Sequence, residues 1–177
     1  TAAPEHLSAH AERINAHSAI RIRPAQGSRL VVTQSDLFGQ SYFVGRIEHL
    51  SFEAVLIPEL SWWNPAVPPG ARDYVLQHEQ IHFALTEIAA RRLTREAGAR
   101  AASLMIVKPD PQAVRDELLR RIAEWSGEAM AAGLERHTRF DEDTSMFYSP
   151  RRQAWWAHEV EEELRQIGRG DPPAAAQ

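Results

Sequence analysis

Two histidines and a glutamate fall within five consecutive residues, His78-Glu79-Gln80-Ile81-His82. Four residues turn an α-helix by roughly 400°, so His78 and His82 would project from one face, one turn apart. This spacing allows both imidazoles to bind one Zn²⁺ at about 2.0–2.1 Å. Glu79 lies about 100° around the same helix, where it reaches a water on the metal rather than the metal itself.

Zinc chemistry explains why these residue types belong together. A bound Zn²⁺ lowers the pKa of its water from about 16 to about 7 and stabilises the oxyanion that forms from a carbonyl. Glu79 would take the proton from that water as general base and pass it to the leaving amine. The pattern therefore predicts a zinc metallopeptidase that hydrolyses a peptide or protein substrate. A catalytic zinc site also needs a third protein ligand and one open position.

The composition of the 177 residues narrows the ligands and the partners. Because the chain has no cysteine, zinc must bind His, Asp or Glu. The formal net charge of −4 and the lack of a basic run argue against nucleic acid as a partner. No apolar stretch approaches the roughly 20 residues that span a bilayer, so we expect no transmembrane segment. The oligomeric state is not indicated.

Periodicity and turn residues predict the elements around the motif. Strands are expected over 19–23, 30–32, 42–44, 52–57 and 104–107, and a short helix is expected over 5–17. A proline-rich connection over 62–70 precedes a helix over 71–97, which contains neither Gly nor Pro. Asp110-Pro111 and Ser149-Pro150 each predict the start of a further helix, and Gly168 its end in the second case. These segments predict an α+β fold, with an N-terminal antiparallel sheet followed by three longer helices.

The residues around the motif resemble a bacterial family of predicted secreted zinc-dependent proteases. Leu76-Gln77-His78-Glu79-Gln80-Ile81-His82-Phe83 is similar to the family's His-Glu-Gln-x-His-Phe helix, and Ala90-Arg91-Arg92-Leu93 to a stretch that often follows it. Phe140-Asp141-Glu142-Asp143-Thr144 matches its aromatic-Asp-x-x-Thr element. The family usually continues with x-His-Gly, where this chain has Ser145-Met146-Phe147.

The resemblance covers roughly residues 60–165 and implies a zincin-like metallopeptidase domain, which we expect over 1–168, with a flexible tail over 169–177. It also implies a periplasmic or secreted protein. Thr1-Ala2-Ala3-Pro4 is compatible with a mature start after a leader is cleaved. The strand over 52–57 is expected to edge the cleft, where an extended peptide would add to it.

Asp141 is the first choice for the third zinc ligand, because it lies in the matched element. A loop between two helices is expected to bring its carboxylate back to His78 and His82. Glu142 and His137 are close rivals. Glu124 or Glu128 on the second helix is the runner-up, since thermolysin-like peptidases take a Glu from a later helix.

Two other functions compete with the peptidase. A zincin-fold binding module that has lost activity is the first, because the family His is missing here. The second is an interaction domain with an exposed apolar surface around Trp155 and Trp156. Among the other candidates, Tyr148 is a possible oxyanion donor, whereas His6, His10, His17 and His158 are interpreted as surface residues. Four tryptophans are interpreted as core or cleft walls, with core preferred: Trp62, Trp63, Trp155 and Trp156.

Overall fold

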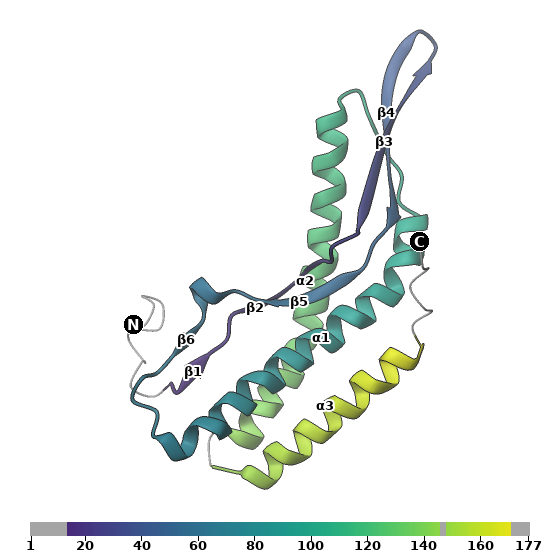
Figure 1. Cartoon of the computed structure of the whole chain (residues 1–177). Coiled ribbons are helices and arrows are strands. Elements are labelled where there is room, and N and C mark those ends of the chain that lie inside the picture. Colours follow the sequence, from purple (N-terminus) through teal and green to yellow (C-terminus); the bar gives the residue numbers. More distant parts are fainter. Residues whose placement is uncertain (1–13, 146–147, 171–177) are drawn as a thin grey trace. The chain divides into compact units, whose positions relative to one another are not determined.

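The computed structural model describes residues 14–145 and 148–170. Figure 1 shows its helices, α1 (Arg72–Ala102), α2 (Pro111–Thr144) and α3 (Pro150–Gly170). The strands are β1 (Ala16–His17), β2 (Ile20–Pro24), β3 (Arg29–Leu37), β4 (Gln40–His49), β5 (Phe52–Leu56), β6 (Trp62–Trp63) and β7 (Ile106–Lys108). The short 3-10 helices η2 (Pro58–Leu60) and η3 (Pro69–Ala71) flank β6. Antiparallel strands followed by three helices confirm the α+β prediction.

The strands form three small sheets rather than the single sheet expected. Their orders are β1-β6, β2-β5 and β3-β4-β7. The expected helix over 5–17 is wrong for its described end, because Ala16 and His17 pair with Trp63 and Trp62 as strands. The segment interpreted as a proline-rich connection therefore also contributes β6. The rest of that expected helix lies outside the described residues.

The chain forms two compact units. The first comprises residues 1–21, 54–88 and 132–177, and the second comprises 22–53 and 89–131. Helices α1 and α2 therefore both contribute one part to each unit. The single domain over 1–168 stays a prediction, and most of the tail expected over 169–177 lies outside the described residues.

The second unit is built on a long hairpin and two helical segments. Strands β3 and β4 pair antiparallel from Arg29↔His49 to Leu37↔Gln40, so Phe38 and Gly39 form a two-residue turn. Both turn residues have positive φ angles, 52° and 76°, which the tight primed hairpin turns require. The helix α2 packs directly on β4, since a Cβ at Gly45 would lie 2.2 Å from Val114 Cγ1. The buried core of this unit consists of Ile22, Ile47, Leu50, Phe52, Ala90, Leu93, Ala97, Val114, Leu118 and Ile122.

The first unit is a bundle of three helical segments. The start of α1, the end of α2 and the whole of α3 lie side by side (Figure 1). The buried residues of α1 and α3 recur at helical spacing and form one apolar stripe on each of these helices, and α2 adds Phe140 to the same cluster. These residues are Ile81, Leu85, Ile88, Phe140, Trp156, Val160 and Ile167.

The helix starts follow the sequence signals, and the helix ends do not. The Asp110 carboxylate accepts hydrogen bonds from the amides of Gln112 (3.3 Å) and Ala113 (2.9 Å), which confirms it as the N-cap of α2. Pro150 is the first residue of α3, as expected. Gly168 does not end α3, which continues to Gly170, and α1 extends past residue 97 to Ala102.

The largest correction concerns the end of α2. A loop was expected around Asp141, but α2 is continuous to Thr144, so Asp141 lies on a helix. The sequence from 134 to 145 has no Gly or Pro to interrupt the helix. Burial of Phe140 and Thr144 further favours the helical path, since both are at most 1% exposed.

The expected docking edge on β5 is already occupied at two positions. The amide of Phe52 donates to Thr94 Oγ1 at 2.8 Å, and the amide of Ala54 donates to Glu87 Oε2 at 3.1 Å. An extended peptide cannot pair with these amides unless the side chains of α1 leave them. Over the described residues, no helix is long and apolar enough to cross a membrane.

Candidate metal centre

Helix α1 presents His78 and His82 from one face, as their spacing predicts. The two Nε2 atoms lie 3.1 Å apart. Ile81 and Leu85 belong to the buried stripe of the same helix and are 3% and 4% exposed. Because this stripe packs α1 into the bundle, the backbone that carries the two imidazoles is held in place.

Asp141 of α2 completes a triangle of ligand atoms with these histidines. Its Oδ1 lies 3.2 Å from His78 Nε2 and 3.0 Å from His82 Nε2. The two helices run antiparallel in this unit, and α2 contributes a second pair of residues one turn apart, His137 and Asp141. The prediction that Asp141 meets the motif histidines agrees with this geometry, although it comes from a helix and not from a loop.

Phe140 forms the apolar floor behind the triangle. Its ring is fully buried and stacks on His78, with centroids 4.5 Å apart and an interplanar angle of 25°. It also meets His82 edge-on at 4.9 Å and Trp156 at 5.5 Å. This packing restricts the rotamers of both imidazoles, because neither ring can tilt toward the core.

Helix α3 holds the ends of α1 and α2 together beside the site. Trp156 Nε1 donates to Asp143 Oδ2 at 2.9 Å. Gln153 Nε2 donates to Tyr74 O and to Gln77 Oε1, both at 2.9 Å. Gln153 is fully buried, so these bonds form away from water, where hydrogen bonds fix geometry most strongly.

The site is partly open to solvent. The side chains of His78 and His82 are 14% and 16% exposed, and that of Asp141 is 48% exposed. Burial raises the pKa of the Asp141 carboxyl, but hydrogen bonds from His78 and His82 outweigh it and hold that pKa well below its usual range. Asp141 is therefore an anion at neutral pH. Burial, reinforced by the neighbouring His82 ring, lowers the pKa of His137 to about 4, so this imidazole is neutral.

The dimensions of the triangle fit a small divalent cation. A tetrahedral ion with bonds of about 2.0–2.1 Å separates its ligand atoms by roughly 3.3 Å. The three edges formed by His78, His82 and Asp141 are 3.0–3.2 Å. Two imidazoles and one carboxylate suit Zn²⁺ and also Fe²⁺. Among the described residues, this is the only group of three or more His, Asp or Glu side chains close enough together to share a metal ion.

Glu79, which follows His78 in the sequence, has a carboxylate without a protein partner among the described residues. Its side chain is half-buried, and among the described residues none forms a hydrogen bond or an ion pair with it. The lone pairs of Glu79 are thus available to accept a proton or a hydrogen bond.

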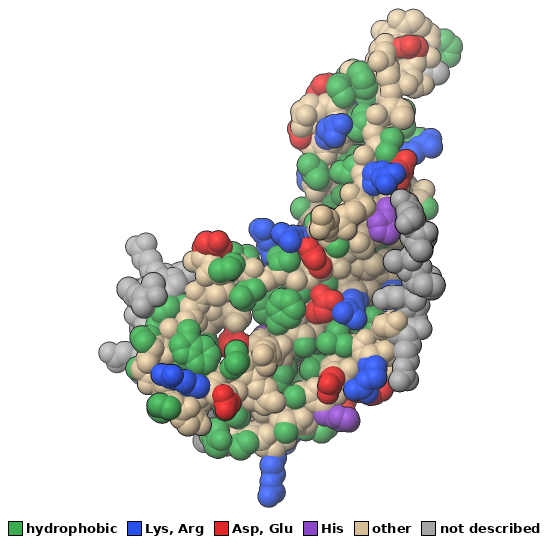
Figure 2. All heavy atoms as spheres, viewed as in Figure 1, with side chains coloured by type: hydrophobic (Ala, Val, Ile, Leu, Met, Phe, Trp, Pro, Cys, Tyr) green, Lys and Arg blue, Asp and Glu red, His purple; other side chains and the backbone are tan. Residues whose placement is uncertain are grey.

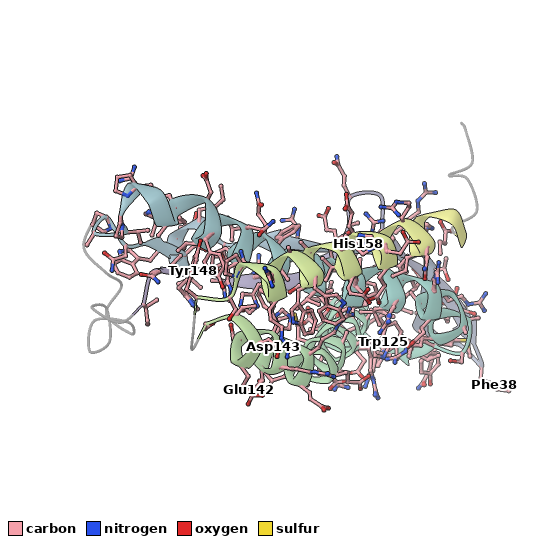
Figure 3. All side chains as sticks on the ribbon, turned by 90° about the horizontal axis from the view of Figure 1, so that it is seen from below. Phe38, Trp125, Glu142, Asp143, Tyr148 and His158 are labelled. Atoms are coloured by element: carbon pink, nitrogen blue, oxygen red, sulfur yellow. The ribbon has the colours of Figure 1, made fainter. Side chains whose placement is uncertain are left out.

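The rival ligands do not join the triangle. Glu142 is exposed, and Figure 3 shows it on the side of α2 away from α3, whereas Asp143 lies toward α3. Glu124 forms ion pairs with Arg120 and Arg121, and Glu128 pairs with Arg100 at 2.8 Å. His137 contacts His82 through Nδ1, on the ring side opposite the triangle.

The remaining candidates divide between surface and core. His6 and His10 lie outside the described residues, and His17 is part of β1. Tyr148 is 71% exposed and packs on Tyr74, with centroids 4.6 Å apart. Figure 3 shows His158 on α3, where it is exposed as expected.

The tryptophans differ from one another in burial. Trp156 is 4% exposed and belongs to the core, as expected, whereas Trp155 is 49% exposed and Trp63 is 36% exposed. Trp62 is intermediate. On the face in Figure 2, acidic and basic side chains are interspersed rather than separated by sign.

Comparisons with protein-family models, with curated proteins and with solved structures found no match. The resemblance to secreted zinc-dependent proteases therefore stays a prediction.

Thr144 and His137 are the residues whose place in the site the sequence did not reveal. In the sequence, Thr144 ends the aromatic-Asp-x-x-Thr element and His137 is a rival candidate for the third ligand. Thr144 Oγ1 lies 3.2 Å from His78 Nδ1, and His137 Nδ1 lies 2.9 Å from His82 Nδ1, so both contact the ring nitrogens that point away from the triangle. His137 lies four residues before Asp141 and Thr144 lies three residues after it, so all three share one face of a helix. This spacing would have indicated their common position if α2 had been predicted to continue to Thr144.

Proposed function

We propose that this protein is a zinc-dependent metallopeptidase. His78, His82 and Asp141 hold the metal, and Glu79 is the general base. The observation that carries the proposal is the convergence of three ligand atoms to within 3.2 Å of one another. Glu79 follows the first of these histidines in the sequence, as the general base does in the His-Glu-x-x-His pattern.

The ligand set supports a catalytic zinc rather than a structural one. Structural zinc sites are closed by four protein ligands, whereas catalytic sites have three and an open position. The triangle supplies three, and its exposed member, Asp141, faces solvent with about half of its side chain. A zinc ion in this position would polarise a scissile carbonyl and acidify a water molecule.

The chain's own residues have separate tasks in this proposal. Glu79 accepts a proton from the attacking water and delivers it to the leaving nitrogen, so that the amine departs neutral. Asp141 remains ionised at neutral pH and offsets the positive charge of the metal. Phe140 closes the side of the site that faces the core, which excludes water from behind the imidazoles.

Metal analysis of the purified protein is the first test. The protein, stripped and then incubated with Zn²⁺, Fe²⁺, Mn²⁺ and Ca²⁺, is expected to retain one Zn²⁺ per chain after gel filtration. Protein that is folded by circular dichroism but retains no transition metal would disprove the proposal. Retention of iron in preference to zinc would redirect it toward oxygen chemistry.

The second test is Glu79→Gln, which keeps the shape of the side chain and removes the base. Hydrolysis of an unfolded protein substrate, followed by release of new amino termini, is expected to fall by about 10²–10⁴-fold with zinc content unchanged. Glu135→Gln makes the same change at an exposed position of the same unit and serves as the matched control.

Two outcomes would contradict this mechanism. Full activity of Glu79→Gln would show that another group accepts the proton. A wild-type protein that holds zinc and hydrolyses none of a broad set of peptides would favour the inactive binding module instead.

A further inference from the structure

The outer nitrogens of both ligand imidazoles contact protein groups of α2. His78 Nδ1 lies 3.2 Å from Thr144 Oγ1, and His82 Nδ1 lies 2.9 Å from His137 Nδ1. A neutral imidazole carries one proton, so a proton at Nδ1 leaves Nε2 with the bare lone pair that binds a metal. The partners at Nδ1 therefore decide whether Nε2 is ready to bind.

The Thr144 hydroxyl has one proton to donate. When that proton is donated to another group, the hydroxyl can only accept a hydrogen bond from His78. Its Oγ1 donates to the Phe140 carbonyl at 2.6 Å, the shorter of its two contacts. The residue is 1% exposed, so water does not compete for it. The remaining lone pairs of Oγ1 can accept a hydrogen bond from His78 Nδ1–H. When a metal replaces the contact between His78 Nε2 and Asp141 Oδ1, this acceptor places the single proton of the ring on Nδ1 and leaves the Nε2 lone pair for the metal.

The contact between His82 and His137 is a hydrogen bond in the plane of both rings. The interplanar angle is 5°, and the ring centroids are 5.2 Å apart. That separation exceeds the 2.9 Å between the nitrogens by about the sum of the two ring radii, so the rings lie end to end rather than face to face. Such a bond needs a proton on one nitrogen and a lone pair on the other.

We propose that Thr144 and His137 are positioning residues, which hold His78 and His82 with Nδ1 protonated and Nε2 directed at the metal. This inference rests on the proposed metal site and goes beyond it, since neither residue touches the metal. It assigns His137 the unusual role of an imidazole acceptor where other sites use a carboxylate or a carbonyl.

Two pairs of variants test the proposal, each with one member that removes the acceptor and one that restores it. His137→Phe keeps a planar ring and loses the acceptor, whereas His137→Asn places its amide oxygen near the position of Nδ1. Thr144→Val keeps the shape and loses the hydroxyl, whereas Thr144→Ser retains it. Circular dichroism and thermal unfolding of each variant establish that it is folded.

The readout is the dissociation constant for Zn²⁺, measured by competition with a chromophoric chelator. His137→Phe and Thr144→Val are each expected to weaken binding by about 10–100-fold, the usual effect of removing a partner of a ligand imidazole. His137→Asn and Thr144→Ser are expected to bind close to wild type. Equal affinity of the removing and the restoring member in both pairs would overturn the proposal.

A second readout does not depend on folding of any variant. In the zinc-loaded wild type, long-range proton–nitrogen correlation spectra are expected to show His78 and His82 with protonated Nδ1 and zinc on Nε2, and His137 with an unprotonated Nδ1. A protonated His137 Nδ1 would overturn the assignment of His137. Failure of the wild type to bind zinc is a different result, since it disproves the proposed function itself.

Discussion

Helices α1 and α2 take part in both units, but they bury different side chains in each. In the second unit they contribute Ala90, Leu93, Ala97, Val114, Leu118 and Ile122 to an aliphatic core. In the first unit they bring together His78, His82, His137, Asp141 and Thr144. Aliphatic contacts stabilise a fold by leaving water, whereas imidazoles and a carboxylate lose hydration when they do so. The same helix pair can thus pack without polar groups, so packing alone does not account for the polar cluster in the first unit.

The largest effect is expected from His82→Ala, which removes a corner of the triangle. Zinc affinity should fall by about 10³-fold or more, because two remaining ligands hold zinc poorly. His158→Ala, at an exposed histidine of α3, is the matched control and should bind as wild type does. Isothermal titration with Zn²⁺ measures both. If His82→Ala bound Zn²⁺ as tightly as the wild type, metal binding would not explain the polar cluster of the first unit, and this difference from the second unit would lose its basis.

A smaller effect, of another kind, is expected from Leu118→Ala in the second unit. Leu118 is fully buried, and loss of its side chain leaves a cavity that costs about 2–5 kcal/mol of unfolding free energy. Urea denaturation measures this loss. The folded fraction should retain its affinity for zinc, because Leu118 belongs to the aliphatic core and not to the triangle. A loss of zinc binding in the folded variant would show that the two regions are coupled.

The smallest effect is expected from Glu128→Gln, at a residue considered as a ligand on sequence grounds. Its carboxylate pairs with Arg100 at 2.8 Å with 62% of the side chain exposed, and Arg100 also pairs with Glu96. Exposed pairs of this kind contribute less than about 1 kcal/mol. Urea denaturation and zinc titration should therefore both resemble wild type. Weaker zinc binding would reinstate Glu128 as a ligand in place of Asp141.

Local signals in the sequence predicted where the helices start and that His78 and His82 project from one face of a helix. Asp110 and Pro150 act within one helical turn of their own positions, so no knowledge of the fold was needed to interpret them. The i, i+4 spacing of His78 and His82 is likewise a property of one helix. Strands β3 and β4 were expected to be shorter, because the polar residues over 33–36 carry no apolar alternation.

The partners from α2 depend on packing that no local pattern contains. Asp141 meets the two histidines from a helix that continues to Thr144 and not from the expected loop, and its role as a zinc ligand stays a prediction. Which of His137, Asp141 and Glu142 faces α1 is set by the rotation of one helix against the other. That rotation is fixed by the burial of Phe140, a long-range contact that periodicity alone cannot supply.

The side chains that cover β5 have a consequence for self-association. An open strand edge is a template on which a second chain can extend a sheet, and proteins commonly blunt it with charge, proline or a covering element. Here Thr94 and Glu87 saturate the amides of Phe52 and Ala54 from within the same chain. The amides of Phe52 and Ala54 are therefore not available to a second chain that would extend the sheet at this edge.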